Sequence, residues 1–198
     1  EAAYVYGMQP NAYFKEQLDT LDKPGRLLLL AEGEGRNAVY AAQKGWQVTA
    51  VDFSEQAKAK ALALAAECGV EIDYHVADIL QFDFGQDESW DMIGLIYAHF
   101  KPDDRLNIHR KCVHALRKDG RLVLEAFNPR QAGRSSGGPK DPGMLYSKRL
   151  LEQDFEKLNL LSAVELTIML DEGNGHKGEG EVVRMHLIRS EFMVLLLP

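Results

Sequence analysis

The sequence predicts a doubly wound α/β fold, with helices on both faces of a mostly parallel sheet of about seven strands. Short apolar runs, which suit strands buried on both faces, alternate with longer runs of helical character. Such an alternation builds a parallel sheet with right-handed crossovers. Towards the C-terminus apolar residues alternate with more polar ones, which indicates an antiparallel hairpin that closes one edge of the sheet.

The first predicted strand, Leu27–Leu30, is wholly apolar and is entered through Pro24-Gly25. Each of the next two helical runs is followed by glycine, the residue that most often ends a helix. The elements after the first strand are a helix over Asn37–Lys44 ended by Gly45, a strand over Trp46–Val51, a helix over Ser54–Cys68 ended by Gly69, and a strand over Glu71–Val76.

The second half of the chain continues the series and then changes pattern. It predicts a strand over Trp90–Tyr97, a helix over Asp103–Lys118 ended by Gly120, a strand over Arg121–Phe127, a loose loop over Asn128–Tyr146 and a helix near Ser147–Leu158. The hairpin strands are indicated by Val164, Leu166, Ile168 and Leu170 and by Val183, Met185 and Leu187, with a glycine-rich turn over Asp171–Gly180.

Length and composition favour one globular domain. The chain has 198 residues, of which 45% are hydrophobic and 27% are charged, as in ordinary globular proteins. We therefore expect a single domain over residues 1–198, with an N-terminal cap of about residues 1–22. Nothing in the sequence predicts an oligomeric state.

Charge and cysteine content exclude several classes of protein. The net charge of −7 argues against nucleic-acid binding, because such proteins carry an excess of clustered Lys and Arg. Cys68 and Cys112 are the only cysteines, so we expect no disulfide framework, and no residue pattern indicates a metal site. The sequence shows neither an apolar stretch of the roughly 20 residues that a membrane span needs nor a signal-peptide pattern, so we expect a cytoplasmic protein.

The turn after the first strand reads Ala31-Glu32-Gly33-Glu34-Gly35-Arg36-Asn37-Ala38. Its glycines match the fingerprint in which the backbone approaches a nucleotide at a helix N-terminus. The alternative is a glycine-rich turn that only lets the strand and the helix pack closely. Asp52 supports the binding site, because a carboxylate at the end of the second strand can accept hydrogen bonds from both ribose hydroxyls, although Asp52 could instead cap the next helix.

The charge of this turn indicates which cofactor it binds. A dinucleotide places its pyrophosphate over the turn, and Glu32 and Glu34 would repel it. The same carboxylates complement the ammonium and sulfonium groups of S-adenosylmethionine (SAM). A Tyr97-x-x-x-Lys101 spacing resembles the catalytic pair of short-chain dehydrogenases, but that pair must lie on one helix, and Pro102 disfavours a helix there.

The run Leu27 to Asn37, then Asp52, then Ala77-Asp78-Ile79, resembles the signature of class I SAM-dependent methyltransferases, which have a Rossmann-like fold. The resemblance covers nearly the whole chain, including the edge hairpin. Within that family, Tyr6-Gly7-x-x-Pro10 and the glycine turn are similar to a bacterial branch of tellurite-resistance and thiopurine-methyltransferase-like proteins.

The resemblance implies a set of cofactor contacts. It places Gly33 and Gly35 at the methionine part of SAM, Asp52 at the ribose, Asp78 at the adenine amino group, and Phe53 and Ile79 against the adenine ring. Two positions depart from the family pattern: Leu29 stands where an acidic residue is common, and Ala31 stands where the first glycine is usual. Glu32 or Glu34 would then bind the ammonium group.

The methyl acceptor is a small molecule that the sequence does not identify, and Tyr6, Arg36, His99 and Arg130 are the candidate residues for it. His99, at the end of the fourth strand, is the candidate general base, or else a packed residue without a chemical role. Residues 128–149 contain five basic residues and one acidic residue. They predict either a mobile lid that attracts an anionic or soft nucleophilic acceptor, or a solvated loop. The N-terminal tyrosines are expected either to close over the acceptor or to pack against a helix.

Two other functions stay open. One is a SAM-binding module without catalysis, because the cofactor residues would be the same. The other is an NAD-type oxidoreductase, which the carboxylates of the turn and the absence of a second domain disfavour.

Overall fold

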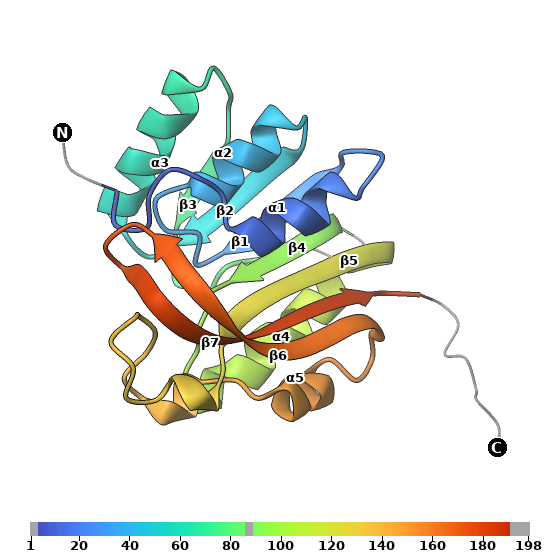
Figure 1. Ribbon diagram of the computed structural model, residues 1–198. Helices are drawn as coiled ribbons and strands as arrows, with labels where there is room; N and C mark the ends of the chain where they lie inside the picture. The colour runs from blue at the N-terminus through green and yellow to red at the C-terminus, as the bar shows by residue number, and fades with distance from the viewer. Residues whose placement is uncertain (1–3, 86–88, 191–198) are drawn as a thin grey trace.

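In a computed structural model that describes residues 4–85 and 89–190, the apolar runs of the sequence form one seven-stranded sheet in the order β3-β2-β1-β4-β5-β7-β6 (Figure 1). The strands are β1 (Arg26–Leu30), β2 (Gln47–Asp52), β3 (Asp73–Val76), β4 (Trp90–Ile96), β5 (Leu116–Phe127), β6 (Asn159–Glu172) and β7 (His176–Ile188). Neighbours from β3 to β5 are parallel, whereas β7 runs antiparallel to β5 and to β6. The predicted fold class and the edge hairpin are confirmed.

Helices cover both faces of this sheet (Figure 1). One face carries α1 (Ala12–Asp19), α2 (Arg36–Gln43) and α3 (Glu55–Glu67), and the other carries α4 (Pro102–Ala115) and α5 (Lys148–Asp154). Two short 3₁₀ turns, η1 (Pro129–Gln131) and η2 (Pro142–Met144), lie in the connection between β5 and α5. No described helix combines the length and the apolar character needed to cross a membrane.

The apolar run of β1 is uninterrupted because both faces of this strand are buried. Its residues Leu27 to Leu30 are each at most 1% exposed. Successive side chains of a strand point to opposite faces, so Leu27 and Leu29 pack with the core under α1 and α2. Leu28 and Leu30 pack with the core under α4 and α5.

Some predicted boundaries were wrong. The helix expected to reach Lys118 ends at Ala115, because the wholly buried Leu116 already pairs with Trp90 in the sheet. Likewise, α5 ends at Asp154 rather than near Leu158. At the end of α4, strand pairing overrides the local helical pattern.

The predicted turn over Asp171–Gly180 was too long. In the structure β6 continues to Glu172 and β7 begins at His176, and these two residues stand opposite each other. Gly180 is a strand residue: a Cβ there would lie 2.5 Å from the Leu170 Cδ1 atom. Gly180, which suggested a turn in the sequence, therefore allows close packing inside the ladder.

The strand order fixes where a ligand can bind. From β1 the chain proceeds through β2 and β3 on one side, and it then returns to place β4 on the other side of β1. This reversal opens a crevice at the carboxyl ends of β1 and β4, the place where doubly wound sheets bind their ligands.

Candidate functional site

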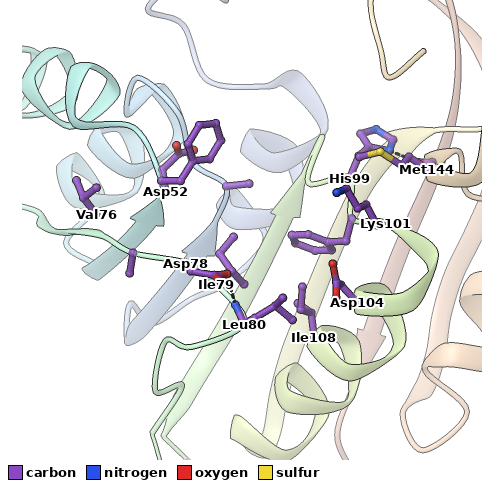
Figure 2. Close-up of a pocket in the computed structure, with 14 residues that line it drawn as sticks. Asp52, Val76, Asp78, Ile79, Leu80, His99, Lys101, Asp104, Ile108 and Met144 are labelled. Atoms are coloured by element: carbon purple, nitrogen blue, oxygen red, sulfur yellow. Dashed lines mark hydrogen bonds between the residues drawn. The ribbon is translucent and has the colours of Figure 1, made fainter. Parts of the chain in front are cut away.

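Two adjoining cavities of about 540 and 430 Å³ lie at the carboxyl ends of the central strands. They share Ala31, Asp52, Phe53 and His99 in their walls. Figure 2 shows the larger cavity, with Asp52, Asp78 and His99 contributed from the ends of different strands. We call the larger one the first cavity and the smaller one the second cavity.

The two glycines of the turn after β1 have different surroundings. Both have positive φ angles, 66° at Gly33 and 88° at Gly35. A Cβ at Gly33 would meet no atom within 4 Å, whereas a Cβ at Gly35 would lie 2.5 Å from the Cβ of Ala61 on α3. Gly33 thus leaves open space at the second cavity, and Gly35 permits close packing of α2 against α3.

Glu32 is the buried carboxylate of the turn, and it lines the second cavity. Its Oε1 atom accepts hydrogen bonds from the backbone N–H groups of Asn37 (3.0 Å) and Ala38 (2.7 Å), in the first turn of α2. Burial raises the pKa of Glu32 to about 7, although these N–H groups and the charge of Arg36 act in the opposite direction. The amides that a pyrophosphate would use are therefore already occupied by a carboxylate of the protein.

Glu34 does not face either cavity. Its carboxylate pairs with Lys60 and accepts a hydrogen bond of 2.6 Å from the Val5 N–H group. The expectation that both carboxylates of the turn face the cofactor therefore needs correction. Glu32 faces the second cavity, and Glu34 joins α3 to the N-terminal segment.

Asp52 lies where the two cavities meet. Its Oδ2 atom accepts a hydrogen bond from the Gly33 N–H (3.0 Å), and its Oδ1 atom accepts one from the Ser54 N–H (3.1 Å). The N-cap of α3 is Ser54, whose hydroxyl accepts from the Ala57 N–H at 3.1 Å. The alternative role of Asp52 as a helix cap is therefore wrong, and its carboxylate instead fixes the glycine turn beside the cleft.

Phe53, Asp78 and Ile79 all line the first cavity. Phe53 is 83% exposed at the rim, and no ring of the described residues stacks on it, which is an unusual position for an aromatic residue. Asp78 accepts a hydrogen bond of 2.9 Å from the Leu80 N–H, which fixes the loop after β3 (Figure 2). These three residues come together as the sequence predicted.

His99 lines both cavities, but both of its ring nitrogens are engaged by the backbone. Its Nδ1 atom lies 2.6 Å from the Met144 carbonyl, and its Nε2 atom accepts the Phe127 N–H at 3.2 Å. Burial lowers the pKa of His99 to about 4, so the ring is neutral near pH 7, with its proton on Nδ1. No lone pair is left to remove a proton from an acceptor. The geometry corrects the general-base assignment: His99 fastens the loop after β5 to β4.

Two basic residues of the loop after β5, Arg130 and Arg134, are also engaged elsewhere. Arg130 pairs with Glu181 (3.0 Å) and Glu165 (3.7 Å), and Arg134 pairs with Glu181 (2.8 Å) and Glu179 (3.2 Å). The described loop residues that line the second cavity are Gly138 and Pro139. The expected role of Arg130 and Arg134 in a positive lid is therefore corrected, because carboxylates of the hairpin neutralise these arginines outside the cleft.

Tyr6 and Arg36, two candidate substrate residues, do line the second cavity. Arg36 is buried and spans two segments: it donates to the Tyr6 carbonyl (3.2 Å) and pairs with Glu172 (3.2 Å). The Tyr6 ring stands 4.6 Å from the His176 ring. The N-terminal segment and the hairpin thus meet over the glycine turn.

Sequence reasoning missed Glu172, His176 and Glu125. Glu125 is wholly buried on β5 and accepts hydrogen bonds from Asn11 (2.7 Å) and Tyr97 (2.8 Å) and from Arg184. If the turn had been placed at Gly173-Asn174-Gly175, the sequence would have predicted that Glu172 pairs with His176.

Among the described residues, no three His, Cys, Asp or Glu side chains gather as a metal site requires.

Residues 27–120, which include β1 to β4, the glycine turn and Asp52, match a family model described as a methyltransferase domain. This segment is similar to that domain over slightly less than half of the chain. The enzyme class that the sequence predicted is thereby confirmed. The pair Tyr97 and Lys101, weighed for a dehydrogenase, does not lie on one helix, because Lys101 is the N-cap of α4.

Solved structures share the fold of this chain at low sequence identity. A protein studied for the conversion of a disulfide bond into a thioacetal group during echinomycin biosynthesis aligns with a TM-score of 0.76 and 18% identity, over 95% of this chain and 85% of its own. TehB from Haemophilus influenzae aligns with a TM-score of 0.74 and 18% identity, over 91% of this chain and 62% of its own. A SAM-dependent methyltransferase from Methanosarcina mazei aligns with a TM-score of 0.67 and 16% identity, over 87% and 95%. No curated protein sequence matches this chain.

Proposed function

We propose that this protein is a SAM-dependent methyltransferase that transfers the methyl group to a small molecule bound in the second cavity. The observation that carries the proposal is the position of Glu32. Its buried carboxylate occupies the N-terminal amides of α2 and lines the cleft, so the turn favours a cationic ligand over a pyrophosphate.

The residues of the cleft fit SAM part by part. The mostly apolar first cavity suits the adenosine, with Phe53 and Ile79 beside the adenine ring and Asp78 beside its amino group. Asp52, where the cavities meet, suits the ribose hydroxyls. The open space at Gly33 and the carboxylate of Glu32 suit the methionine part with its ammonium and sulfonium groups.

SAM supplies the reactive methyl group, so the protein chiefly orients the reactants and excludes water. Asp52 fixes the glycine turn through the Gly33 N–H and so sets the floor of the cleft. Tyr6 and Pro139 line the second cavity from the N-terminal segment and from the loop after β5. We propose that the whole chain works as one domain, and that the described part of the N-terminal cap borders this cavity through Tyr6.

The acceptor proposed here is neutral rather than anionic. The second cavity is bounded by the rings of Tyr6, Tyr97, Phe127 and His176, and its one arginine, Arg36, is paired with Glu172. Arg130 and Arg134, which favoured an anionic acceptor in the sequence, are paired with carboxylates of the hairpin. The charges of this cavity therefore give little support to an oxyanion as the acceptor.

Calorimetric titration with SAM, S-adenosylhomocysteine and NAD tests the proposed cofactor. We expect SAM and S-adenosylhomocysteine to bind and NAD not to bind, because Glu32 occupies the anion site. Binding of NAD with the affinity of SAM would contradict the proposal. Binding of SAM with no methyl transfer to any of a panel of hydroxyl, thiol and amine compounds would favour the alternative of a SAM-binding module without catalysis.

A further inference from the structure

The hairpin between β6 and β7 brings a histidine into the wall of the second cavity. His176 is the first residue of β7 and is 5% exposed. The turn before it lies against the N-terminal segment, where the Gly175 N–H donates to the Val5 carbonyl at 2.9 Å (Figure 1). His176 is thus held between two segments that are far apart in the sequence.

The Nδ1 atom of His176 lies 3.0 Å from the Oε2 atom of Glu172. Glu172 is fixed by Arg36 at 3.2 Å and by the Asn11 side-chain amide at 3.0 Å. Burial alone would raise the pKa of Glu172, but the hydrogen bond from His176 and the charge of Arg36 lower it to about 2. A carboxylate that is always ionised keeps the proton of the neutral imidazole on Nδ1 and leaves Nε2 as the acceptor.

The Nε2 atom of His176 has no hydrogen-bond partner among the residues that the structure describes, and it is not sealed from solvent as the Nε2 atom of His109 is. His99, the other histidine of the cleft, has both nitrogens occupied. The ring of His176 is held by Tyr97 (4.3 Å between centroids) and Phe127 (5.1 Å). This is the geometry of an oriented base with one free lone pair in a substrate cavity.

We propose, on the basis of the methyltransferase function above, that His176 is the general base of the reaction and that the second cavity takes a small, neutral, single-ring aromatic acceptor with a hydroxyl group. The acceptor oxygen forms a bond to the methyl carbon while the carbon–sulfur bond breaks. The electron pair of that bond stays on sulfur, giving S-adenosylhomocysteine. The hydroxyl proton moves to Nε2 of His176, and the resulting imidazolium is stabilised by Glu172 until it releases the proton to water.

The residues that line the second cavity indicate an aromatic acceptor. The rings of Tyr6, Tyr97 and Phe127 surround His176 and offer stacking and edge contacts to a planar ring. A hydroxyl acceptor explains why a base is useful, because a phenol is largely protonated near pH 7 and its oxygen is a poor nucleophile until it loses the proton. The cavity of about 430 Å³ accommodates one such ring beside the methionine part of SAM.

Nuclear magnetic resonance of the histidine side chains tests the base independently of activity. The titratable and charged groups around His176 are Glu172 on its hairpin, Tyr6, Tyr97 and His99, with Arg36 behind Glu172. We expect the neutral ring of His176 to carry its proton on Nδ1 in the wild type, and to lose this preference for one tautomer in Glu172→Gln. The side-chain signals of the exposed His114 on α4 should be alike in both proteins. A neutral His176 ring with its proton on Nε2 in the wild type would overturn the proposal.

Methyl transfer to phenol and to the more acidic 4-nitrophenol tests the acceptor and the role of His176 together. We expect His176→Asn to slow transfer to phenol on the order of 100-fold. The loss should be much smaller with 4-nitrophenol, which ionises without help near neutral pH. His114→Asn, a matched substitution outside the cleft, should keep the wild-type rate with both compounds.

The remaining outcomes separate this proposal from the proposed function. Equal losses of transfer rate with both phenols in His176→Asn would mean that His176 only maintains structure. If the wild-type protein binds SAM but transfers no methyl group to either phenol, the proposed acceptor class is wrong. Absence of SAM binding in calorimetry would instead contradict the methyltransferase function itself. SAM affinity in His176→Asn should stay within about threefold of the wild type, because the ring lies on the acceptor side of the cleft.

Discussion

At the scale of single residues, the carboxylates of the cleft differ in role although the sequence presents them alike. Glu32 is buried against the first turn of α2, Glu34 pairs with Lys60 outside the cleft, and Asp52 joins the glycine turn to β2. Two of them, Glu32 and Asp52, can therefore respond to a bound ligand, and each gives a prediction of its own.

Asp52→Ala should weaken SAM binding by about 1–3 kcal/mol, the range for hydrogen bonds to a charged acceptor. The measurement is a calorimetric titration of the variant, with its fold checked by circular dichroism. Asp73→Ala is the control, because Asp73 is an exposed residue of β3 outside both cavities. An unchanged dissociation constant in folded Asp52→Ala would remove Asp52 from the proposed ribose site.

Glu32 should make SAM binding depend on pH. With its pKa raised to about 7 by burial, the carboxyl is protonated at pH 5.5 and gains charge as the pH rises. SAM affinity should therefore increase between about pH 5.5 and 7.5, below the range near pH 8 in which a free α-amino group loses its charge. Glu32→Gln, which can still accept the N–H groups of α2, should bind weakly with a flat profile. A parallel rise in the variant would assign the pH effect to another group.

The same shift predicts the pH dependence of stability. Between the ordinary value of 4.5 and about 7, the folded protein holds a proton on Glu32 that the unfolded chain has lost. The stabilising contribution is thus present below pH 4.5 and is lost as the pH rises through about 7. The difference in unfolding free energy between Glu32→Gln and the wild type should therefore grow over this range in urea denaturation. A constant difference would show that Glu32 ionises normally in the folded state.

At the scale of elements, the glycine turn serves both as a ligand surface and as a joint between α2 and α3. Gly33→Ala should cost about 1–2 kcal/mol of stability through its positive φ angle, and it should weaken SAM binding, because the new methyl group enters the open space of the second cavity. Gly35→Ala carries the same backbone strain and also a contact of 2.5 Å with Ala61, so we expect a larger loss of stability, about 2–5 kcal/mol.

Thermal unfolding and calorimetry of the two glycine variants separate these effects. The larger loss of stability should fall on Gly35→Ala, and the larger loss of affinity per folded molecule on Gly33→Ala. If the order of the two stability losses were reversed, the assignment of Gly35 to helix packing would be wrong.

At the scale of the whole molecule, buried polar side chains connect the N-terminal segment to the far edge of the sheet. Asn11 donates to Glu125 on β5 and to Glu172 on β6, and its Oδ1 atom caps α1 by accepting the Phe14 N–H at 2.9 Å. Arg184 on β7 pairs with the same Glu125. This network holds the N-terminal segment in place beside the second cavity.

Asn11→Asp separates the network from the helix cap. Aspartate caps a helix as well as asparagine does, but here its charge would face Glu125 and Glu172. We expect a loss of at least about 2 kcal/mol in urea denaturation near pH 7, because a buried donor is replaced by a like charge. The loss should shrink at lower pH as the new carboxyl becomes protonated. Wild-type stability at pH 7 would mean that the network contributes little.

The sequence by itself determined the elements and the cofactor side of the cleft. The apolar run of β1, the helix-ending glycines and the edge hairpin depend on local periodicity and backbone chemistry, which a single segment of sequence expresses. Asp52, Phe53, Asp78 and Ile79 follow directly after strands, and the ends of parallel strands meet at one edge of a sheet. Their assembly around one cleft was therefore predictable.

Only the tertiary structure decided the acceptor side and the charges there. His176 and Glu172 reach the cleft because β7 runs antiparallel beside β5, a pairing between residues more than 50 positions apart. The same hairpin neutralises Arg130 and Arg134, and the loop after β5 occupies His99. Local sequence reports which groups can ionise or donate, whereas long-range strand pairing decides which partner each group meets and so which of them stays free to act.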